Sequence, residues 1–234
     1  MKKVLIAIAA LVAVTFSASA QHNVKFSKDA NLAFGSKVFF VEPISYMGYG
    51  FHLMNKTMAT EQNAFNNEFF VNIMELGLRP TKNIMFALGV DYNLSQYRLD
   101  SNHAWAAQEN DKVWITSSTT SFSKLKYSRL NVHTFAIPLS FEVRANKGAF
   151  RIGAMGEYNL PAVVKNKGVD NSGSTVRKKI TGIKTNDLTY SFFGSLSYGG
   201  LGVYGKYSPA FQFAEGDGPH FNTITIGLVL GLGM

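Results

Sequence analysis

Cysteine is absent from the 234-residue chain. Disulfide bonds and a lipid-modified N-terminal cysteine are therefore both excluded, and packing alone must provide the core. Charged residues are scarce at 16% of the sequence, where a soluble domain usually carries about 25%. Beyond residue 20 no run of about 20 apolar residues occurs, so no helix of the mature chain is expected to span a bilayer.

The N-terminus has the composition of a secretory signal peptide. A short basic start precedes an apolar run at 4–16, and Ala18 and Ala20 occupy the small-residue positions of a cleavage site. These 13 apolar residues are too few to cross hydrocarbon about 30 Å thick, which argues against a membrane anchor. The expected organisation is a cleaved signal peptide at 1–20, a periplasmic tail at 21–33 and one domain at 34–234.

The mature chain is basic. Without the two lysines of the signal peptide, 21 basic residues stand against 15 acidic ones, a net charge of +6. This balance suits nucleic acid, acidic lipid or an acidic protein. Because export separates the chain from nucleic acid, we expect outer-membrane lipid as the partner, with lipopolysaccharide and a protein of a membrane complex as further candidates.

Apolar residues alternate with polar or small ones over most of the mature chain, which is the period of a half-buried β-strand. About eight segments have this pattern, and no comparable helical period is present. They lie near 34–45, 67–79, 83–98, 129–144, 148–161, 186–198, 201–209 and 221–233. Pro138 falls inside the fourth, and because proline cannot donate to a ladder we expect a β-bulge there.

Short and long connections alternate strictly between these segments. The short ones, rich in Gly, Pro and Asn, lie at 79–83, 145–148 and 199–200, whereas the long ones lie near 46–66, 99–128, 162–185 and 210–220. Outer-membrane barrels have short periplasmic turns and long outer loops. The sequence therefore predicts an all-β protein, an eight-stranded antiparallel up-and-down transmembrane β-barrel in the outer membrane.

The two faces of the strands indicate which solvent each one meets. Two-residue turns would place Glu142 opposite Arg151 and Phe193 opposite Lys206. The polar face is mostly uncharged, which suits the interior of a narrow barrel better than a surface in water. We therefore expect the apolar face to contact lipid. Tyrosines expected on this face, near strand ends, are Tyr92, Tyr158, Tyr198 and Tyr207, and the charges expected in the lumen are Asp91, Glu142, Arg144, Arg151, Glu157 and Lys206.

Two stretches resemble the PorT-like family of outer-membrane β-barrels. One is Leu130–Arg144, with its Ile-Pro-Leu core after Lys124-Leu-Lys-Tyr127, and the other is Gly202–Tyr207 followed by Gly218-Pro219 and Ile226-Gly-Leu228. The resemblance covers the mature chain and implies an outer-membrane barrel, usually without assigned activity, although some relatives serve protein secretion. It supplies no functional residues. Many such barrels end in Phe, whereas this chain ends in Met234.

The lumen charges permit two interpretations. They could form a proton relay or narrow polar path, or a charge-paired plug that satisfies buried groups; we favour the plug. An open pore is not expected, because eight strands enclose little space.

An enzyme is also not expected. His133 could serve an esterase-like triad in a lipid-A-modifying barrel, but no serine and acid stand at a recognisable spacing from it. The other histidines, at 22, 52, 103 and 220, have no spacing that would bind zinc. We therefore expect no catalytic residue, cofactor or metal.

A basic stretch within 162–185 is the candidate contact for an anionic glycolipid, unless it is merely a solvated loop. Its cations are Lys165, Lys167, Arg177, Lys178, Lys179 and Lys184. Trp105 and Trp114 could stack on sugars, but packing within their own loop is the favoured interpretation.

The leading functional hypothesis is a non-enzymatic outer-membrane barrel that is structural or binds surface partners through its outer loops. The alternatives are an accessory subunit of a secretion or transport complex, a secreted lipocalin-like lipid carrier and a lipid-A-modifying enzyme.

Overall fold

A computed structural model describes residues 32–34, 37–54, 66–107, 112–120, 122–210, 212–213 and 217–231. The predicted signal peptide and the predicted tail up to residue 31 lie outside these ranges, as does Met234. No helix among the described residues is long and apolar enough to cross a membrane.

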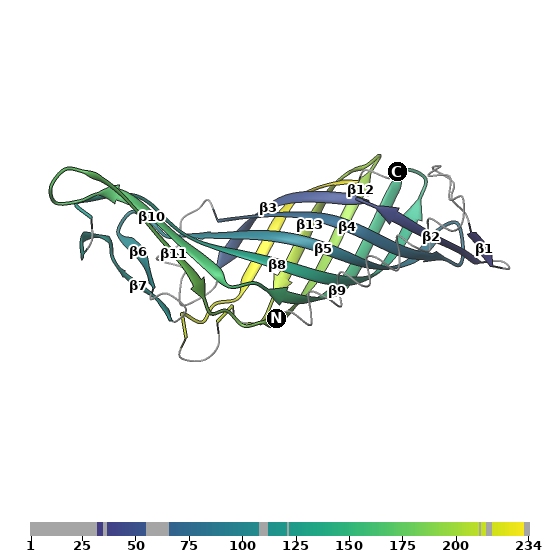
Figure 1. Ribbon diagram of the computed structural model, residues 1–234. Coiled ribbons are helices and arrows are strands. Elements are labelled where there is room, and N and C mark those ends of the chain that lie inside the picture. Colours follow the sequence, from purple (N-terminus) through teal and green to yellow (C-terminus); the bar gives the residue numbers. More distant parts are fainter. Residues whose placement is uncertain are drawn as a thin grey trace.

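The described chain is all-β and forms a closed antiparallel barrel of eight strands (Figure 1). The first barrel strand is made of two pieces, β2 and β3, which both pair with β4. Each following strand pairs with the next one along the barrel, and β14 pairs with β3 to close it. The barrel strands are β2 (Lys37–Pro43), β3 (Tyr46–Met54), β4 (Asn67–Arg79), β5 (Ile84–Arg98), β8 (Lys124–Ala145), β9 (Gly148–Asn159), β12 (Leu188–Tyr198), β13 (Leu201–Ser208) and β14 (Thr223–Gly231).

The two ends of the barrel differ. At one end, called here the turn end, the connections 80–83, 146–147 and 199–200 join neighbouring strands. Gly199 and Gly200 both have positive φ, as a tight turn of this kind requires. At the other, the hairpin end, two further hairpins lie beyond the barrel. The remaining elements are β1 (Leu32–Phe34), β6 (His103–Ala107), β7 (Val113–Ser117), the 3-10 turn η1 (Ser118–Thr120), β10 (Ala162–Val169) and β11 (Thr175–Ile183).

The barrel is apolar outside and polar inside. Phe192 and Ile226 are 51% and 62% exposed on the outer surface, whereas their neighbours Ser191 and Thr225 are fully buried in the interior. Lys206 is buried as well. The predicted cross-strand pairs are confirmed, since Glu142 lies opposite Arg151 and Phe193 lies opposite Lys206.

The segment predicted as the beginning of the first long loop is instead a strand. β3 takes up 46–54, the first part of the predicted connection 46–66, and supplies the edge on which the barrel closes. Its outer face carries Tyr49, Phe51 and Leu53, all exposed. Its inner face includes Gly48 and Gly50. Because glycine has no side chain, the alternation of polar and apolar residues is weak here, and the strand was not predicted from the sequence. The glycines leave room for the ring of Phe70 and the hydroxyl group of Tyr204 inside the barrel.

The irregularity expected at Pro138 lies elsewhere. β8 keeps one register with β9 through Pro138, and its register with β5 is the same on either side of it, so the predicted bulge is wrong. Gly89 of β5 has no Cβ to meet the proline ring. The register shifts instead in β4, between Asn72 and Met74, opposite the positive-φ residue Ile44 that separates β2 from β3.

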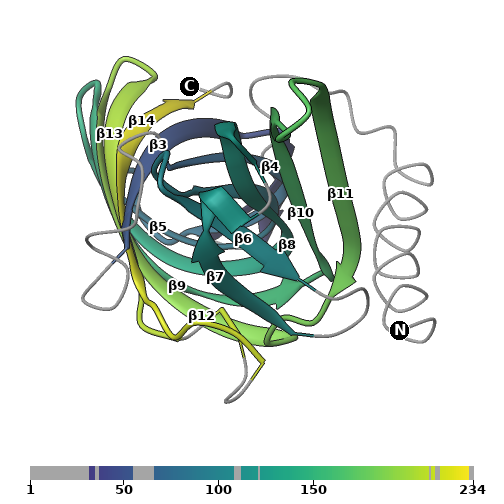
Figure 2. The same cartoon turned by 90° about the vertical axis from the view of Figure 1, so that its left-hand side faces the viewer.

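The predicted loops 99–128 and 162–185 also contain regular structure. The hairpin β6–β7 lies across the mouth of the barrel, and β10–β11 extends from its rim (Figure 2). β10 pairs with the N-terminal part of β8, so the barrel wall continues outward as a sheet. A hydrophobic cluster fills the space below β6–β7, and the hairpin together with this cluster is called here the cap. It contains Met54, Tyr97, Leu99, Trp105, Val113, Leu130, Val132, Ala162, Val164, Ile183, Phe213 and Phe221.

Candidate functional site

One cluster of ion pairs lies in the lumen toward the turn end. The guanidinium of Arg151 donates to Glu75 at 2.6 Å and to Glu142 at 2.7 Å, and Arg144 pairs with the other oxygen of Glu142. Arg151 also lies over the ring of Tyr46, 5.1 Å from its centroid. Both carboxylates are buried, so each receives a charged donor in place of water.

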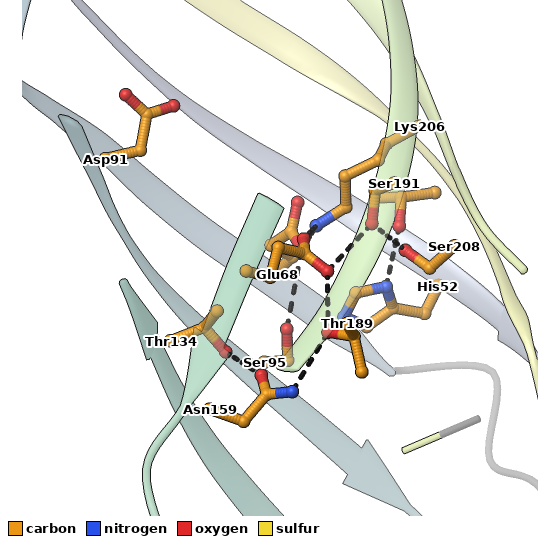
Figure 3. A network of polar contacts seen from close by, with 12 residues as sticks. His52, Glu68, Asp91, Ser95, Thr134, Asn159, Thr189, Ser191, Lys206 and Ser208 are labelled. Carbon is orange, nitrogen blue, oxygen red and sulfur yellow. Dashed lines mark hydrogen bonds and ion pairs between the residues drawn. The ribbon is translucent and has the colours of Figure 1, made fainter. Parts of the chain in front are cut away.

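A second cluster occupies the middle of the lumen (Figure 3). The ammonium of Lys206 pairs with Glu68 and lies 3.6 Å from a carboxylate oxygen of Glu157. The other oxygen of Glu157 accepts hydrogen bonds from Ser191 at 2.9 Å and Thr189 at 3.1 Å. One buried cation therefore compensates two buried acids, and hydroxyl groups donate hydrogen bonds to the second carboxylate oxygen of Glu157.

Asp91 stands apart from both clusters. It accepts hydrogen bonds from Asn72 at 2.7 Å and from the Tyr46 hydroxyl at 3.1 Å, and Asn72 in turn accepts one from Ser45. Among the described residues no cation pairs with it. Asp91 is thus held by neutral donors, unlike the other acids predicted for the lumen.

The central cluster divides the space inside the barrel. A cavity of about 80 Å³ lies toward the turn end, and one of about 20 Å³ lies toward the hairpin end. Glu68, Asn93 and Lys206 line both of them. Beyond the smaller cavity lies the hydrophobic cluster, in which Trp105 is fully buried and donates its indole N–H to the carbonyl of Tyr97.

All six predicted lumen residues therefore face the interior, in two ion-pair clusters and one neutral network. Sequence reasoning missed Glu68 and Glu75, which complete the clusters. The register shift in β4 explains the omission. Before it Glu68 and Asn72 point inward, and after it Glu75 does, so no single alternation places all three on one face.

The histidines and tryptophans have structural contacts. His133 lies outside the barrel wall, where its Nδ1 contacts the Tyr92 hydroxyl, and His52 bonds to Thr225 inside. No group of three or more metal-ligating side chains occurs in the described part of the chain. Trp105 packs within the cap, as favoured, whereas Trp114 is 48% exposed.

The predicted cationic loop is in fact the hairpin β10–β11 together with its C-terminal continuation. Lys165 and Lys167 lie opposite Lys179 and Arg177, all on one face. Lys178 points to the other face, where its ammonium lies 5.6 Å from the centroid of the Phe122 ring. Lys184 lies beyond the end of β11.

No protein-family model matches this chain, and no curated protein matches it. The closed eight-stranded barrel neither supports nor contradicts the predicted resemblance to PorT-like barrels.

Proposed function

We propose that this protein is an outer-membrane β-barrel with a filled lumen, which acts without catalysis as a membrane-embedded support for its two surface hairpins. The turn end would face the periplasm and the hairpin end the exterior. The observation that carries this proposal is the inverted surface, because every barrel strand has exposed apolar side chains on its outer face, whereas the ion-paired charges of the barrel lie inside.

The dimensions of the apolar surface suit a bilayer. On β9 the outward residues run from Phe150 to Tyr158, eight steps of about 3.4 Å, or about 27 Å along the strand. A tilt of about 40° reduces this to about 21 Å, close to the apolar band of about 25 Å in outer-membrane barrels. A lipocalin-like carrier would have its apolar face inside instead, so the surface favours a membrane protein.

The contents of the lumen support a structural role over a pore. Two ion-pair clusters stand one behind the other, and the hydrophobic cluster lies beyond them. An ion would have to displace Lys206 from its two acids and then pass an apolar cap. This arrangement supports the charge-paired plug over the proton relay.

The arrangement also gives no support to a hydrolase. The contact of His133 is with Tyr92. Ser191 and Ser95, which donate to acids, lie inside the barrel, and Ser172, which donates to Asp170, lies at the exposed tip of the β10–β11 hairpin. A lipid acyl group outside the wall does not reach Ser191 or Ser95.

Fractionation and planar-bilayer recording test the proposal together. We expect the protein in the outer-membrane fraction, with heat-modifiable migration, no steady conductance and no release of fatty acid from lipid. Recovery from the periplasm without detergent, steady conductance or lipid hydrolysis would contradict it. Co-purification with a stoichiometric membrane protein would favour the accessory-subunit alternative.

A further inference from the structure

The sheet that continues beyond the barrel has two different faces. β8 pairs with β9 from Thr134 to Ala145 but with β10 from Lys124 to Asn131. On the inner face, Ser128 donates to Asn166, which donates to the carbonyl of Trp105. The inner face of this sheet therefore packs against β6 of the cap.

The outer face carries a row of cations at directly paired positions. Arg98 lies opposite Arg129, Arg129 lies opposite Lys165, and Lys165 lies opposite Lys179. The row crosses four strands, β5, β8, β10 and β11, which is about 14 Å at ordinary strand spacing. A second row behind it adds Lys167 and Arg177.

This arrangement is unfavourable without an anion. Like charges directly opposite each other destabilise a sheet, and none of these six cations forms an ion pair with a described residue. Three polar atoms in the same patch are buried without a hydrogen-bond partner among the described residues: Nε of Arg98, Nε of Arg129 and Oδ1 of Asn131. Two of them are donors, as a site for oxyanions requires.

The position of the row indicates the source of the anion. It lies on the same outward face as the apolar surface, four residues beyond Leu94 on β5 and six beyond Phe135 on β8. Four residues are about 14 Å along a strand, or about 10 Å along the barrel axis at a tilt of about 40°. Long basic side chains at this height reach back toward lipid headgroups.

We propose that Arg98, Arg129, Lys165 and Lys179 bind the phosphate groups of an anionic glycolipid in the outer leaflet around the barrel. This inference rests on the proposed function, because it requires the apolar surface to be in a membrane. Arginine guanidinium groups bind phosphate in a bidentate manner, and the row is long enough for two phosphates side by side. The site differs from the one predicted from the sequence, since it includes Arg98 and Arg129, leaves out Lys178 and Lys184, and has Lys167 and Arg177 only in the second row behind it.

The test compares two quadruple variants of the full chain in lipid nanodiscs. The row variant carries Arg98→Gln, Arg129→Gln, Lys165→Gln and Lys179→Gln. The control carries Lys82→Gln, Lys112→Gln, Lys147→Gln and Lys184→Gln, which removes the same charge from exposed positions that are not part of the row. The probes are lipopolysaccharide and the same preparation after chemical removal of its phosphates, with binding measured by native mass spectrometry.

We expect the row variant to bind lipopolysaccharide at least about tenfold more weakly than wild type, because several charge-assisted contacts are lost, and the control to bind like wild type. We expect the wild-type protein to bind the dephosphorylated preparation more weakly than intact lipopolysaccharide, by the same factor as the row variant loses. Equal binding by both variants, or undiminished binding of the dephosphorylated lipid, would overturn the inference. Complete displacement by inositol hexakisphosphate at matched phosphate concentration would also overturn it, by identifying a soluble ligand.

The folded state of each variant is checked by heat-modifiable migration. A wild-type chain that never enters nanodiscs contradicts the proposed function itself. A folded, inserted row variant with unchanged binding contradicts only the phosphate site.

Discussion

At the scale of single residues, Lys206 is the side chain on which the middle of the lumen depends. It is the cation for both Glu68 and Glu157, and all three are buried. Removing one partner of a buried ion pair leaves the other charge without compensation, which costs more than the pair itself contributes. In a variant without Lys206, the uncompensated charges of Glu68 and Glu157 would therefore lower the stability of the barrel.

We expect Lys206→Met to lower the free energy of unfolding by about 3–5 kcal/mol, measured by urea denaturation of the protein in vesicles. Adding Glu68→Gln should restore part of the loss, since one uncompensated charge is then removed. Lys82→Met, at an exposed position of the turn end, should change stability by less than about 0.5 kcal/mol. If Lys206→Met were as stable as wild type, the ion pair of Lys206 with Glu68 would not stabilise the barrel.

Asp170 fixes the tip of the β10–β11 hairpin. Its carboxylate accepts hydrogen bonds from the Ser172 hydroxyl and from the backbone N–H groups of Ser172 and Ser174. The Ser172 hydroxyl, followed by these backbone groups, lowers the pKa of Asp170 below its ordinary value of 3.8. The contribution to local stability is therefore present above the unfolded pKa and is lost as the pH falls through the folded pKa.

Amide exchange at Ser174 should therefore stay slow from neutral pH down to about pH 5, and the amide should lose protection below about pH 4, once intrinsic exchange rates are taken into account. In Asp170→Asn the side chain does not titrate, so this pH dependence should disappear. Persistence of the same transition in that variant would assign it to another group.

At the scale of elements, β6 acts as a cap over the hairpin end. Trp105 is fully buried in the hydrophobic cluster, whereas Trp114 of β7 is 48% exposed. We expect Trp105→Ala to destabilise the protein by about 3–5 kcal/mol and Trp114→Ala by less than about 0.5 kcal/mol. Urea denaturation of both variants measures the difference, and similar losses would contradict the cap.

The strands also show how much of the fold could be predicted from the sequence. Alternation located β4, β5, β9, β12 and β13 to within a few residues, because a wall with an apolar outer face and a polar lumen repeats every second residue. It failed for β3, where glycines carry no pattern on the inner face. Alternation also failed to identify the inward residues of β4 beyond its register shift. A bulge exchanges the inward and outward positions of a strand, and only the pairing with β5 shows where the bulge lies. The row at Arg98 joins residues from four strands, so it needed the register of all of them.

At the scale of the whole molecule, the decisive property is the solvent that surrounds the barrel. Ile226 lies on the outer face within the apolar band, and Leu188 lies on the same surface at the start of β12. We expect Ile226→Lys to cost about 2–4 kcal/mol in a bilayer and Leu188→Lys only about 0–1 kcal/mol, because the cost falls toward the membrane interface. Equal costs, measured by denaturation from vesicles, would argue against a bilayer of this depth.

The most direct measurement uses the absence of native cysteine. Single cysteines at Phe192, Ser195, Leu196 and Ser197 are labelled with nitroxide in the protein reconstituted into vesicles, and accessibility to oxygen and to a polar nickel chelate is recorded. The labels at 192 and 196 should be reached by oxygen dissolved in lipid, and those at 195 and 197, where the native serines line the turn-end cavity, should be less accessible to it. High oxygen accessibility at 195 and 197 with protection at 192 and 196 would contradict the central claim.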